Sequence, residues 1–395
     1  MKFIILGAGY SGLRAALDLH ELLRGRSPAA EVTLVDQNPY HQLIQMLHLT
    51  ATTAHDSREA IYDLQPLLSD TAIRFVQGRA TAISPLERSV TLADGQLLPY
   101  DRLLLALGAE TAYGGVPGAQ EYALPLRSYD QALHLRQHLH AQFVAAAKAT
   151  DPKEQRTLLT TAIVGGGYTG CQLAGELAAW ADDLCAQTGA PRAEVRIALL
   201  DRSPTLLEQF GTWATREAER VFDELGVSVY LRTAVEAVEP QLLRVSGGRV
   251  LRAATIVWAA GIRAPALLRE SGLPVDSAGR ALVDRYLRVQ DQALIFAAGD
   301  CAAIPDGSES VPATASYAMR EGAHLAETLL AEYEGKPPRP YEPLKLGELV
   351  SLGPDYAVGN PLGVAVTGYP ALLLKKGVET YYRSTIEGPL KGVLP

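Results

Sequence analysis

Cysteine is scarce in this sequence, which contains only Cys171, Cys185 and Cys301. Three cysteines cannot form a structural disulfide framework, so a reducing compartment fits the composition best. If Cys171 and Cys185 lie on one helix, they are roughly 21 Å apart at ~1.5 Å per residue. A disulfide requires Cα atoms within ~7 Å, so this pair cannot be bridged.

Long apolar runs and an excess of positive charge are also missing. The most apolar stretch, residues 162–181, includes five glycines together with Gln172 and Glu176, which is unlike a membrane span. Residues 3–6 run directly into a glycine turn, so we expect no signal peptide. The 36 basic and 44 acidic residues give a net charge of −8, which argues against nucleic acid as a partner.

Predicted strands and helices alternate along the chain, which indicates an α/β fold with parallel sheets. A strand at 2–6, a helix at 11–24 and a strand at 31–36 form one βαβ unit. The same order recurs with a strand at 161–165, a helix at 169–188 and a strand at 194–200. Residues 148–157 are charged and contain a proline, so they are expected to be a surface connection. The sequence therefore predicts two similar units joined by other segments.

The first unit contains a G-x-G-x-x-G turn between its strand and its helix. In this pattern Gly7 allows the tight turn, Gly9 lets the backbone approach a pyrophosphate, and Gly12 lets helix and strand pack closely. Asp36 follows 24 residues after Gly12, at the end of the next strand, where a carboxylate can bind a ribose hydroxyl. Tyr10 and Ser11 complete the turn. Together these features predict a dinucleotide site.

The second unit repeats the signature at Gly165, Gly167 and Gly170, with Tyr168 and Thr169 inside the turn. Asp201 follows 31 residues after Gly170. A carboxylate there favours a free 2′-hydroxyl and so NADH over NADPH, although Arg202 is of the type that binds a 2′-phosphate. Two such turns in one chain predict two dinucleotides, most simply a flavin and a nicotinamide. The spacing alone leaves open which turn holds which.

Several further segments resemble those of one family. They are Tyr100–Gly108, Val257–Gly261 and Leu294–Ala302, the last with a Gly299-Asp300 pair. With the two glycine turns, they make nearly the whole chain similar to the type II NADH:quinone oxidoreductases, two-dinucleotide-binding flavoproteins. This resemblance implies FAD in the first turn and NADH in the second.

The resemblance also implies the domain organisation, with two Rossmann-like dinucleotide-binding domains and a short C-terminal region. The FAD domain is expected to be discontinuous, residues 1–115 and 270–332. The NADH domain, residues 116–269, is inserted between its parts. Residues 333–395 form the C-terminal region, with a short amphipathic helix at 371–386. Ala371, Leu374, Val378, Tyr381 and Tyr382 are expected to share one face of that helix.

The resemblance assigns further residues to the cofactor sites. Ala106, Gly108, Gly299, Asp300 and Ala315 are expected beside the flavin, and Ala260 and Gly261 beside the nicotinamide. The family also carries a lysine near the flavin on its short C-terminal helix. Of the two lysines in this helix, Lys376 is favoured over Lys375.

Two positions depart from the family pattern. Gln172 stands where the family usually has a glutamate near the nicotinamide and quinone, and an amide cannot exchange a proton near neutral pH. It is nevertheless the catalytic candidate. Ser316 and Arg320 replace both glutamines of the family's quinone-site pattern Ala-Gln-x-Ala-x-Gln, so the acceptor pocket is expected to be narrowed, charged or lost.

The remaining chemically active side chains have ordinary structural interpretations. Cys171 and Cys301 are expected to be buried fillers. His41 and His48 are expected to form structural hydrogen bonds, and no Cys/His cluster indicates a metal. Glu176, one turn after Gln172, could replace the missing carboxylate or form a helix-packing salt bridge.

The sequence thus predicts an FAD-dependent NADH dehydrogenase that passes electrons to a quinone-like acceptor. A soluble acceptor, or a slow redox-sensing role, are the alternatives. We expect a cytoplasmic protein with a weak, salt-sensitive contact to the inner face of the cell membrane, made by its C-terminal helix. The physiological acceptor and the presence of a homodimer are left open.

Overall fold

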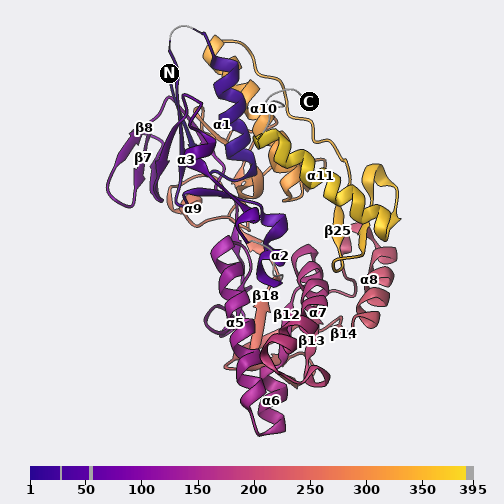
Figure 1. The fold of residues 1–395 in the computed structure, drawn as a ribbon. Helices are drawn as coiled ribbons and strands as arrows, with labels where there is room; N and C mark the ends of the chain where they lie inside the picture. The colour runs from indigo at the N-terminus through magenta and orange to yellow at the C-terminus, as the bar shows by residue number, and fades with distance from the viewer. Residues whose placement is uncertain (27–28, 53–56, 388–395) are drawn as a thin grey trace.

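A computed structural model describes residues 1–26, 29–52 and 57–387 of the chain. Two parallel sheets, one in each half of the molecule, organise it (Figure 1). In their central strands every residue except Lys2 is buried, as expected for parallel strands that are covered on both faces.

The first sheet has the strand order β21-β9-β1-β2-β5. Its members are β1 (Lys2–Leu6), β2 (Glu31–Asp36), β5 (Arg74–Gln77), β9 (Arg102–Leu105) and β21 (Ile295–Ala297). All of the pairings are parallel. The last strand, β21, comes from a part of the chain that follows the second sheet, so the first sheet is assembled from two separated segments.

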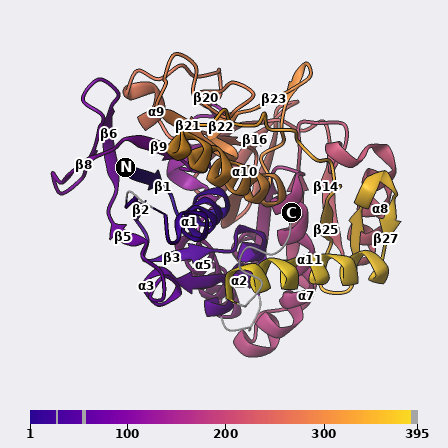
Figure 2. The same ribbon diagram turned by 90° about the horizontal axis from the view of Figure 1, so that it is seen from above.

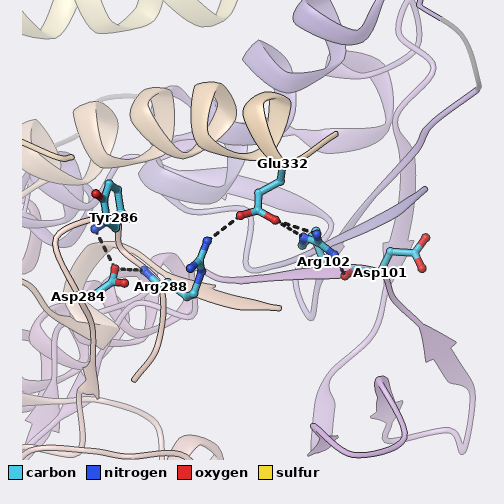
Figure 3. A network of polar contacts seen from close by, with 6 residues as sticks. All are labelled: Asp101, Arg102, Asp284, Tyr286, Arg288 and Glu332. Atoms are coloured by element: carbon cyan, nitrogen blue, oxygen red, sulfur yellow. Dashed lines mark hydrogen bonds and ion pairs between the residues drawn. The ribbon is translucent and has the colours of Figure 1, made fainter. Parts of the chain in front are cut away.

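Two helices lie together on this sheet, α1 (Tyr10–Leu23) and α10 (Ala315–Glu334). Gly322 allows their close approach, because a Cβ built there would lie 2.2 Å from the carbonyl oxygen of Ser11. A second point of attachment is an ion-pair network. Glu332 of α10 accepts from Arg102 at 2.7 Å and from Arg288 at 2.6 Å (Figure 3). One carboxylate therefore joins residues from the two separated chain segments that build this half of the molecule.

The second sheet has the order β11-β18-β12-β13-β14. Its strands are β11 (Leu124–Pro125), β12 (Thr160–Val164), β13 (Arg196–Leu200), β14 (Val227–Tyr230) and β18 (Thr255–Trp258). Helices α5 (Tyr129–Lys148), α7 (Tyr168–Thr188) and α8 (Thr212–Glu224) pack around it. The short helix α2 (Leu47–Thr52) comes from the first half of the chain but packs on α5 and α7.

Antiparallel sheets lie beside the two parallel ones. One contains β6 (Ala80–Ser84), β7 (Ser89–Leu92) and β8 (Leu97–Pro99). Another contains β15 (Val235–Glu239), β16 (Leu242–Val245) and β17 (Arg249–Arg252). Short two-residue strands at β10 (Glu110–Thr111) and β19 (Ile262–Arg263) pair where the chain passes between the halves.

Residues 148–157, predicted as a surface connection, are mostly exposed and link α5 to β12, but they also contain most of a helix that was not predicted, α6 (Pro152–Leu158). Asp151 caps this helix by accepting from the backbone N–H of Lys153 at 3.0 Å, and Pro152 occupies the first helical turn. An Asp-Pro pair begins a helix well, because proline's fixed φ suits the first turn and its missing N–H is not needed there.

The C-terminal region consists of β25 (Leu349–Ser351), β26 (Ala357–Gly359), β27 (Val366–Thr367) and α11 (Tyr369–Glu387), which passes over the region of α2 and α7 (Figure 2). The expected single apolar face of this helix is in fact divided. Ala371 and Tyr382 are buried, whereas Leu374, Val378 and Tyr381 are exposed. The helix therefore has one apolar side in the core and another at the surface. No helix within the described residues has the length and apolar character needed to cross a bilayer.

Candidate functional site

The first glycine turn connects β1 to α1 and is closed by backbone contacts. Gly7 has φ of +102°, and a Cβ there would lie 2.2 Å from the carbonyl oxygen of Ala106. A Cβ on Gly12 would lie 1.9 Å from the carbonyl oxygen of Gly7. Neither distance can accommodate a side chain, so both positions require glycine. This explains why the helix starts so close to the strand.

Gly9, the middle glycine of the turn, faces open space. A Cβ built on it meets nothing within 4 Å, and no side chain caps the helix that begins after it. The first N–H groups of a helix have no partner within the helix, and the helix dipole makes this end positive. The turn can therefore hold a pyrophosphate against backbone N–H groups.

Asp36 at the end of β2 holds the turn. Its carboxylate accepts from the backbone N–H of Ala8 at 2.7 Å and from that of Asn38 at 2.8 Å. Burial raises the pKa of Asp36, and these hydrogen bonds oppose the rise. A carboxylate has about four acceptor positions, so it can still accept from a ribose hydroxyl.

The second glycine turn, between β12 and α7, repeats this geometry. Gly165 has φ of +113°, and a Cβ there would lie 2.6 Å from the carbonyl oxygen of Ala259. A Cβ on Gly170 would lie 1.8 Å from the carbonyl oxygen of Gly165, whereas one on Gly167 would meet nothing within 4 Å. As in the first turn, the first and third glycines have no room for a side chain, and the middle glycine leaves space in which a ligand can approach the backbone.

Asp201 at the end of β13 holds this second turn as Asp36 holds the first. It accepts from the backbone N–H of Gly166 at 2.5 Å and from that of Ser203 at 2.6 Å. Arg202 is exposed beside it. Within the turn, Tyr168 packs on Phe210 with ring centroids 5.6 Å apart, and its buried hydroxyl has no hydrogen-bond partner.

Ala260 and Gly261, which follow β18, are exposed, and Gly261 has φ of +128°.

The Gly299-Asp300 pair lies next to the first turn. A Cβ on Gly299 would be 2.9 Å from the hydroxyl of Ser11, so the turn that follows β21 meets α1 there. Asp300 forms an ion pair with Arg127 at 2.8 Å. The backbone N–H of Gly299 donates to Glu321 at 2.6 Å, and burial raises the pKa of Glu321 to about 7.

A small cavity opens beside this pair. Its lining includes Gly299, Asp300, Glu321 and Thr314, and the buried hydroxyl of Thr314 has no hydrogen-bond partner. Thr314 directly precedes Ala315, the first residue of α10. Gly108, which follows β9, has φ of +64°. An unpaired hydroxyl at a helix start beside a cavity suits a polar ligand such as the ribityl chain of a flavin.

Arg127, Glu321 and Tyr382 are site residues that the sequence did not single out. Tyr382 of α11 donates from its hydroxyl to Nε2 of His41 at 2.8 Å, and Nδ1 of His41 faces the carbonyl oxygen of Ala8 at 2.7 Å. A carbonyl only accepts, so Nδ1 carries the proton and Nε2 is the acceptor. Burial lowers the pKa of His41 to about 4, which keeps the ring neutral.

Tyr382 also packs on Tyr10 of the first turn, with ring centroids 4.6 Å apart. The C-terminal helix is thereby attached to the first glycine turn through both a ring contact and a hydrogen bond. No local sequence signal could reveal this attachment, because the contact joins residues 341 positions apart.

The two lysines of α11 point in different directions. Lys376, which the family resemblance favours as the lysine near the flavin, is exposed, whereas Lys375 is 8% exposed and binds Glu379 at 2.5 Å. The buried lysine is therefore Lys375. The assignment of Lys376 as the lysine near the flavin stays a prediction, and its side chain lies on the solvent side of the helix.

Gln172 and Glu176 are both buried on α7. Gln172 donates from its side-chain amide to the hydroxyl of Ser351 at 3.3 Å, which attaches α7 to β25. Burial raises the pKa of Glu176 to about 7, and the nearby charge of Lys375 opposes the rise.

Ser316 and Arg320, one turn apart on α10, bind each other. The guanidinium of Arg320 donates to the hydroxyl of Ser316 at 3.0 Å and to the carbonyl oxygen of Leu344 at 2.9 Å, and it stacks on Tyr317. A positive charge therefore lies where the family pattern has neutral amides.

All three cysteines are buried and free. Burial raises the pKa of Cys171 well above its ordinary value and that of Cys301 to about 12. The Sγ of Cys301 contacts the carbonyl oxygen of Ala298 at 3.3 Å. These thiols are packing groups, since reactivity requires a thiolate.

Comparison with known proteins agrees with this geometry. Residues 1–322 match the family model described as pyridine nucleotide-disulphide oxidoreductase. The chain is 30% identical over 386 residues to the type II NADH:quinone oxidoreductase of Staphylococcus saprophyticus, and 29% identical to that of Staphylococcus aureus. Each alignment covers 96% of this chain and 94% of the relative.

Solved structures share the fold. NDH2 from Plasmodium falciparum, in complex with NADH, superposes with a TM-score of 0.85 at 18% identity, covering 96% of this chain and 94% of the other. The sulfide:quinone oxidoreductase of Aquifex aeolicus superposes with a TM-score of 0.79 at 19% identity, covering 98% and 91%.

Proposed function

The chain belongs to the pyridine nucleotide-disulphide oxidoreductases and, among them, to the type II NADH:quinone oxidoreductases, and from this premise we propose that it oxidises NADH and reduces a quinone through FAD. The observation that carries the proposal is the pair of glycine turns. In each turn, two glycines lie against backbone atoms that leave no room for a side chain, and the middle glycine has free space beside it. In each turn, an aspartate also accepts a hydrogen bond from a backbone N–H group of the turn.

The residues of the first turn fit FAD. The N–H groups that follow Gly9 would hold the pyrophosphate, Asp36 would accept from the adenosine ribose, and the Gly299-Asp300 pair with Thr314 would bind the ribityl chain. When bound, FAD supplies an acceptor for the hydride and a donor of electrons to the quinone. The protein's task is to position the two substrates and to exclude water.

The residues of the second turn fit NADH. The N–H groups after Gly167 hold its pyrophosphate, and Asp201 accepts from the 2′-hydroxyl of its ribose. Ala260 and Gly261 follow β18 at the carboxyl edge of the sheet, where an α/β sheet binds its ligand. Gly261 keeps this edge free of side-chain bulk beside the nicotinamide.

The acceptor site is proposed at the start of α10, with Ser316 and Arg320 in its wall. Arg320 donates to the hydroxyl of Ser316 and to the carbonyl oxygen of Leu344. Because these bonds hold its guanidinium in the wall, the acceptor pocket is expected to be narrow and positively charged there. Short, soluble quinones should therefore be reduced faster than long-tailed ones. Replacing both residues by glutamine should improve the turnover of quinones without altering the reaction with NADH.

The protein is proposed to attach weakly to the membrane surface through α11. Its exposed side carries Tyr369, Leu373, Leu374 and Val378, each 46–62% exposed, next to Lys376. An apolar helix face with a lysine beside it suits the headgroup region of an anionic bilayer. Sedimentation with anionic phospholipid vesicles should recover the protein at low salt and release it at high salt. Recovery that is unchanged by Leu374→Ser with Val378→Ser would contradict the role of this face.

Anaerobic stopped-flow absorbance tests the function. The purified protein should be yellow, NADH should bleach its visible flavin absorbance, and a short-tailed quinone should restore it. A protein that NADH bleaches but that no quinone restores, while a soluble redox protein does, would replace the quinone by that acceptor.

A further inference from the structure

A carboxyl group is buried where the segment after β21 meets the first glycine turn. Glu321 of α10 is only 2% exposed, and its carboxyl group accepts from the backbone N–H of Gly299 at 2.6 Å. Gly299 begins η5 (Gly299–Cys301), the short 3-10 helix that follows β21. Glu321 also lines the small cavity that is shared by Asp300 and Thr314. This carboxyl group therefore borders the space assigned to the flavin, although the proposed function gives it no role.

Close packing joins Glu321 to the first glycine turn. Its neighbour Gly322 lies against α1, where a Cβ would be 2.2 Å from the carbonyl oxygen of Ser11. A Cβ on Gly299 would be 2.9 Å from the hydroxyl of the same serine. Helices α1 and α10 run side by side along this contact (Figure 2). Because Ser11 belongs to the first turn, a ligand phosphate held by that turn brings its negative charge close to Glu321.

No cation neutralises this carboxyl group directly. Among the residues that the structure describes, no arginine, lysine or histidine forms an ion pair with Glu321. The guanidinium of its neighbour Arg320 donates to the carbonyl oxygen of Leu344 at 2.9 Å, and Arg127 pairs with Asp300. A buried carboxylate without an ion-pair partner is costly, and the group avoids this cost by keeping its proton.

The charged and titratable groups around Glu321 act in opposite directions. Burial raises the pKa of Glu321 to about 7, and its hydrogen bond to the backbone opposes the rise. The charge of Asp300 on η5 raises this pKa further, whereas that of Arg320 on α10 lowers it. The charge of Glu321 also reaches Tyr341, after α10, and Cys301, on η5, and both stay neutral because burial raises their pKa. A bound ligand with further negative charge would raise the pKa of Glu321 again.

We propose that Glu321 is a cofactor-binding residue that works in its protonated form, so that FAD binds together with a proton and is released more readily as the pH rises above neutrality. This inference rests on the proposed function, which places FAD at the first turn. In its acid form the carboxyl group still accepts from Gly299 and has an O–H to donate into the cavity. As a carboxylate it has nothing to donate, and its charge lies close to those of Asp300 and of the ligand phosphates.

Proton linkage gives the direction of the effect. Without FAD, Glu321 titrates near pH 7, and with FAD bound its pKa is higher because nearby negative charge favours the neutral acid. Well below this range both forms carry the proton, so the affinity for FAD does not depend on pH. Above it, binding takes up a proton from water, and the affinity falls by at most about tenfold per pH unit for one proton.

Release of FAD from the purified holoprotein tests the proposal. The fluorescence of free FAD after dilution gives the Kd at each pH. For the wild type, the Kd should rise about tenfold between about pH 6.5 and about pH 8.5. Glu321→Gln, a neutral side chain of the same shape, should keep the low-pH affinity and show no rise. Glu327→Gln, the same change at an exposed position of α10, should behave as the wild type.

Two further measurements separate proton binding from a merely structural role. Arg320→Gln should move the rise in Kd to higher pH, because the cation that favours the carboxylate is lost. Isothermal titration of FAD into wild-type protein stripped of its cofactor, repeated in two buffers of different ionisation enthalpy, counts the protons. It should find about one proton taken up per FAD slightly above neutrality, and none with Glu321→Gln. The count on the wild type decides the question even if a variant does not fold.

Three results would overturn the proposal. One is a wild-type Kd for FAD that stays constant up to about pH 8.5. Another is a rise in Kd that persists in Glu321→Gln, and the third is FAD binding to the wild type without proton uptake slightly above neutrality. Failure of the proposed function is distinguishable, because the purified protein would then contain no FAD at any pH.

Discussion

The two glycine turns are nearly identical in local geometry but differ in what covers them. In both turns, a Cβ added to the first or third glycine would lie 1.8–2.6 Å from a backbone oxygen. A Cβ added to the middle glycine would meet no protein atom within 4 Å. The first turn is additionally held by α11, through Tyr382, Tyr10 and His41. No residue of α11 forms a described contact of this kind with the second turn. The difference suits a cofactor that stays bound in the first turn and a substrate that exchanges at the second.

The largest effect on stability is expected from adding a side chain to the third glycine of either turn. Gly12→Ala and Gly170→Ala each place a Cβ within 2 Å of a backbone carbonyl oxygen, which only a shift of helix from strand can relieve. Each variant should lose several kcal/mol of stability, more than the ~1 kcal/mol typical of single substitutions. Thermal unfolding followed by circular dichroism measures the loss. Melting at the wild-type temperature in either variant would contradict the account of that turn.

The next effect concerns the ion pairs that join the two separated chain segments around the first turn. Glu332→Gln removes the charge shared by Arg102 and Arg288, and the buried Nε of Arg288 already has no partner (Figure 3). The free energy of unfolding should fall by about 2 kcal/mol, since hydrogen bonds to charged groups contribute about 1.5–3 kcal/mol. Urea unfolding gives the value. Glu224→Gln, in an exposed ion pair, is the control and should change stability by less than ~1 kcal/mol.

Much of this pattern could be predicted from the sequence, because glycine spacing and strand position are local. The turns, their aspartates and both βαβ units follow from residues that are close in the chain. The attachment of Tyr382 to His41 and of Arg127 to Asp300 could not, since these partners are 341 and 173 positions apart. The division of α11 into a buried and an exposed apolar side also depends on tertiary packing. Periodicity alone places Ala371 and Leu374 on one face.

A smaller effect distinguishes the ligand of the second turn. Asp201→Asn should raise kcat/KM for NADPH relative to NADH by about tenfold, roughly 1.4 kcal/mol, because a 2′-phosphate is no longer repelled and Arg202 lies beside it. Asp36→Asn should leave this ratio unchanged and weaken FAD retention instead. Steady-state rates with both nucleotides provide the measurement. A wild type that uses NADPH as well as NADH would refute the role given to Asp201.

The smallest effect tests the cover of the first turn. Tyr382→Phe keeps the ring contact with Tyr10 but removes the hydrogen bond to His41, which contributes about 1 kcal/mol. The dissociation rate of FAD should rise about fivefold, as roughly 1 kcal/mol implies. Fluorescence of released FAD follows the rate, and the Kd for NADH should not change. An unchanged dissociation rate would show that α11 does not help to retain the cofactor.

The central claim is that the two turns hold different dinucleotides, and the open middle glycines allow a direct test. Gly9→Ala and Gly167→Ala add a methyl group where the protein itself has room but a pyrophosphate must approach. For each folded variant, one measures the flavin content after purification and the NADH concentration needed to bleach it. The account predicts that Gly9→Ala is purified without FAD, and that Gly167→Ala retains FAD but requires far more NADH. The reverse outcome, or loss of FAD in both, would contradict the assignment.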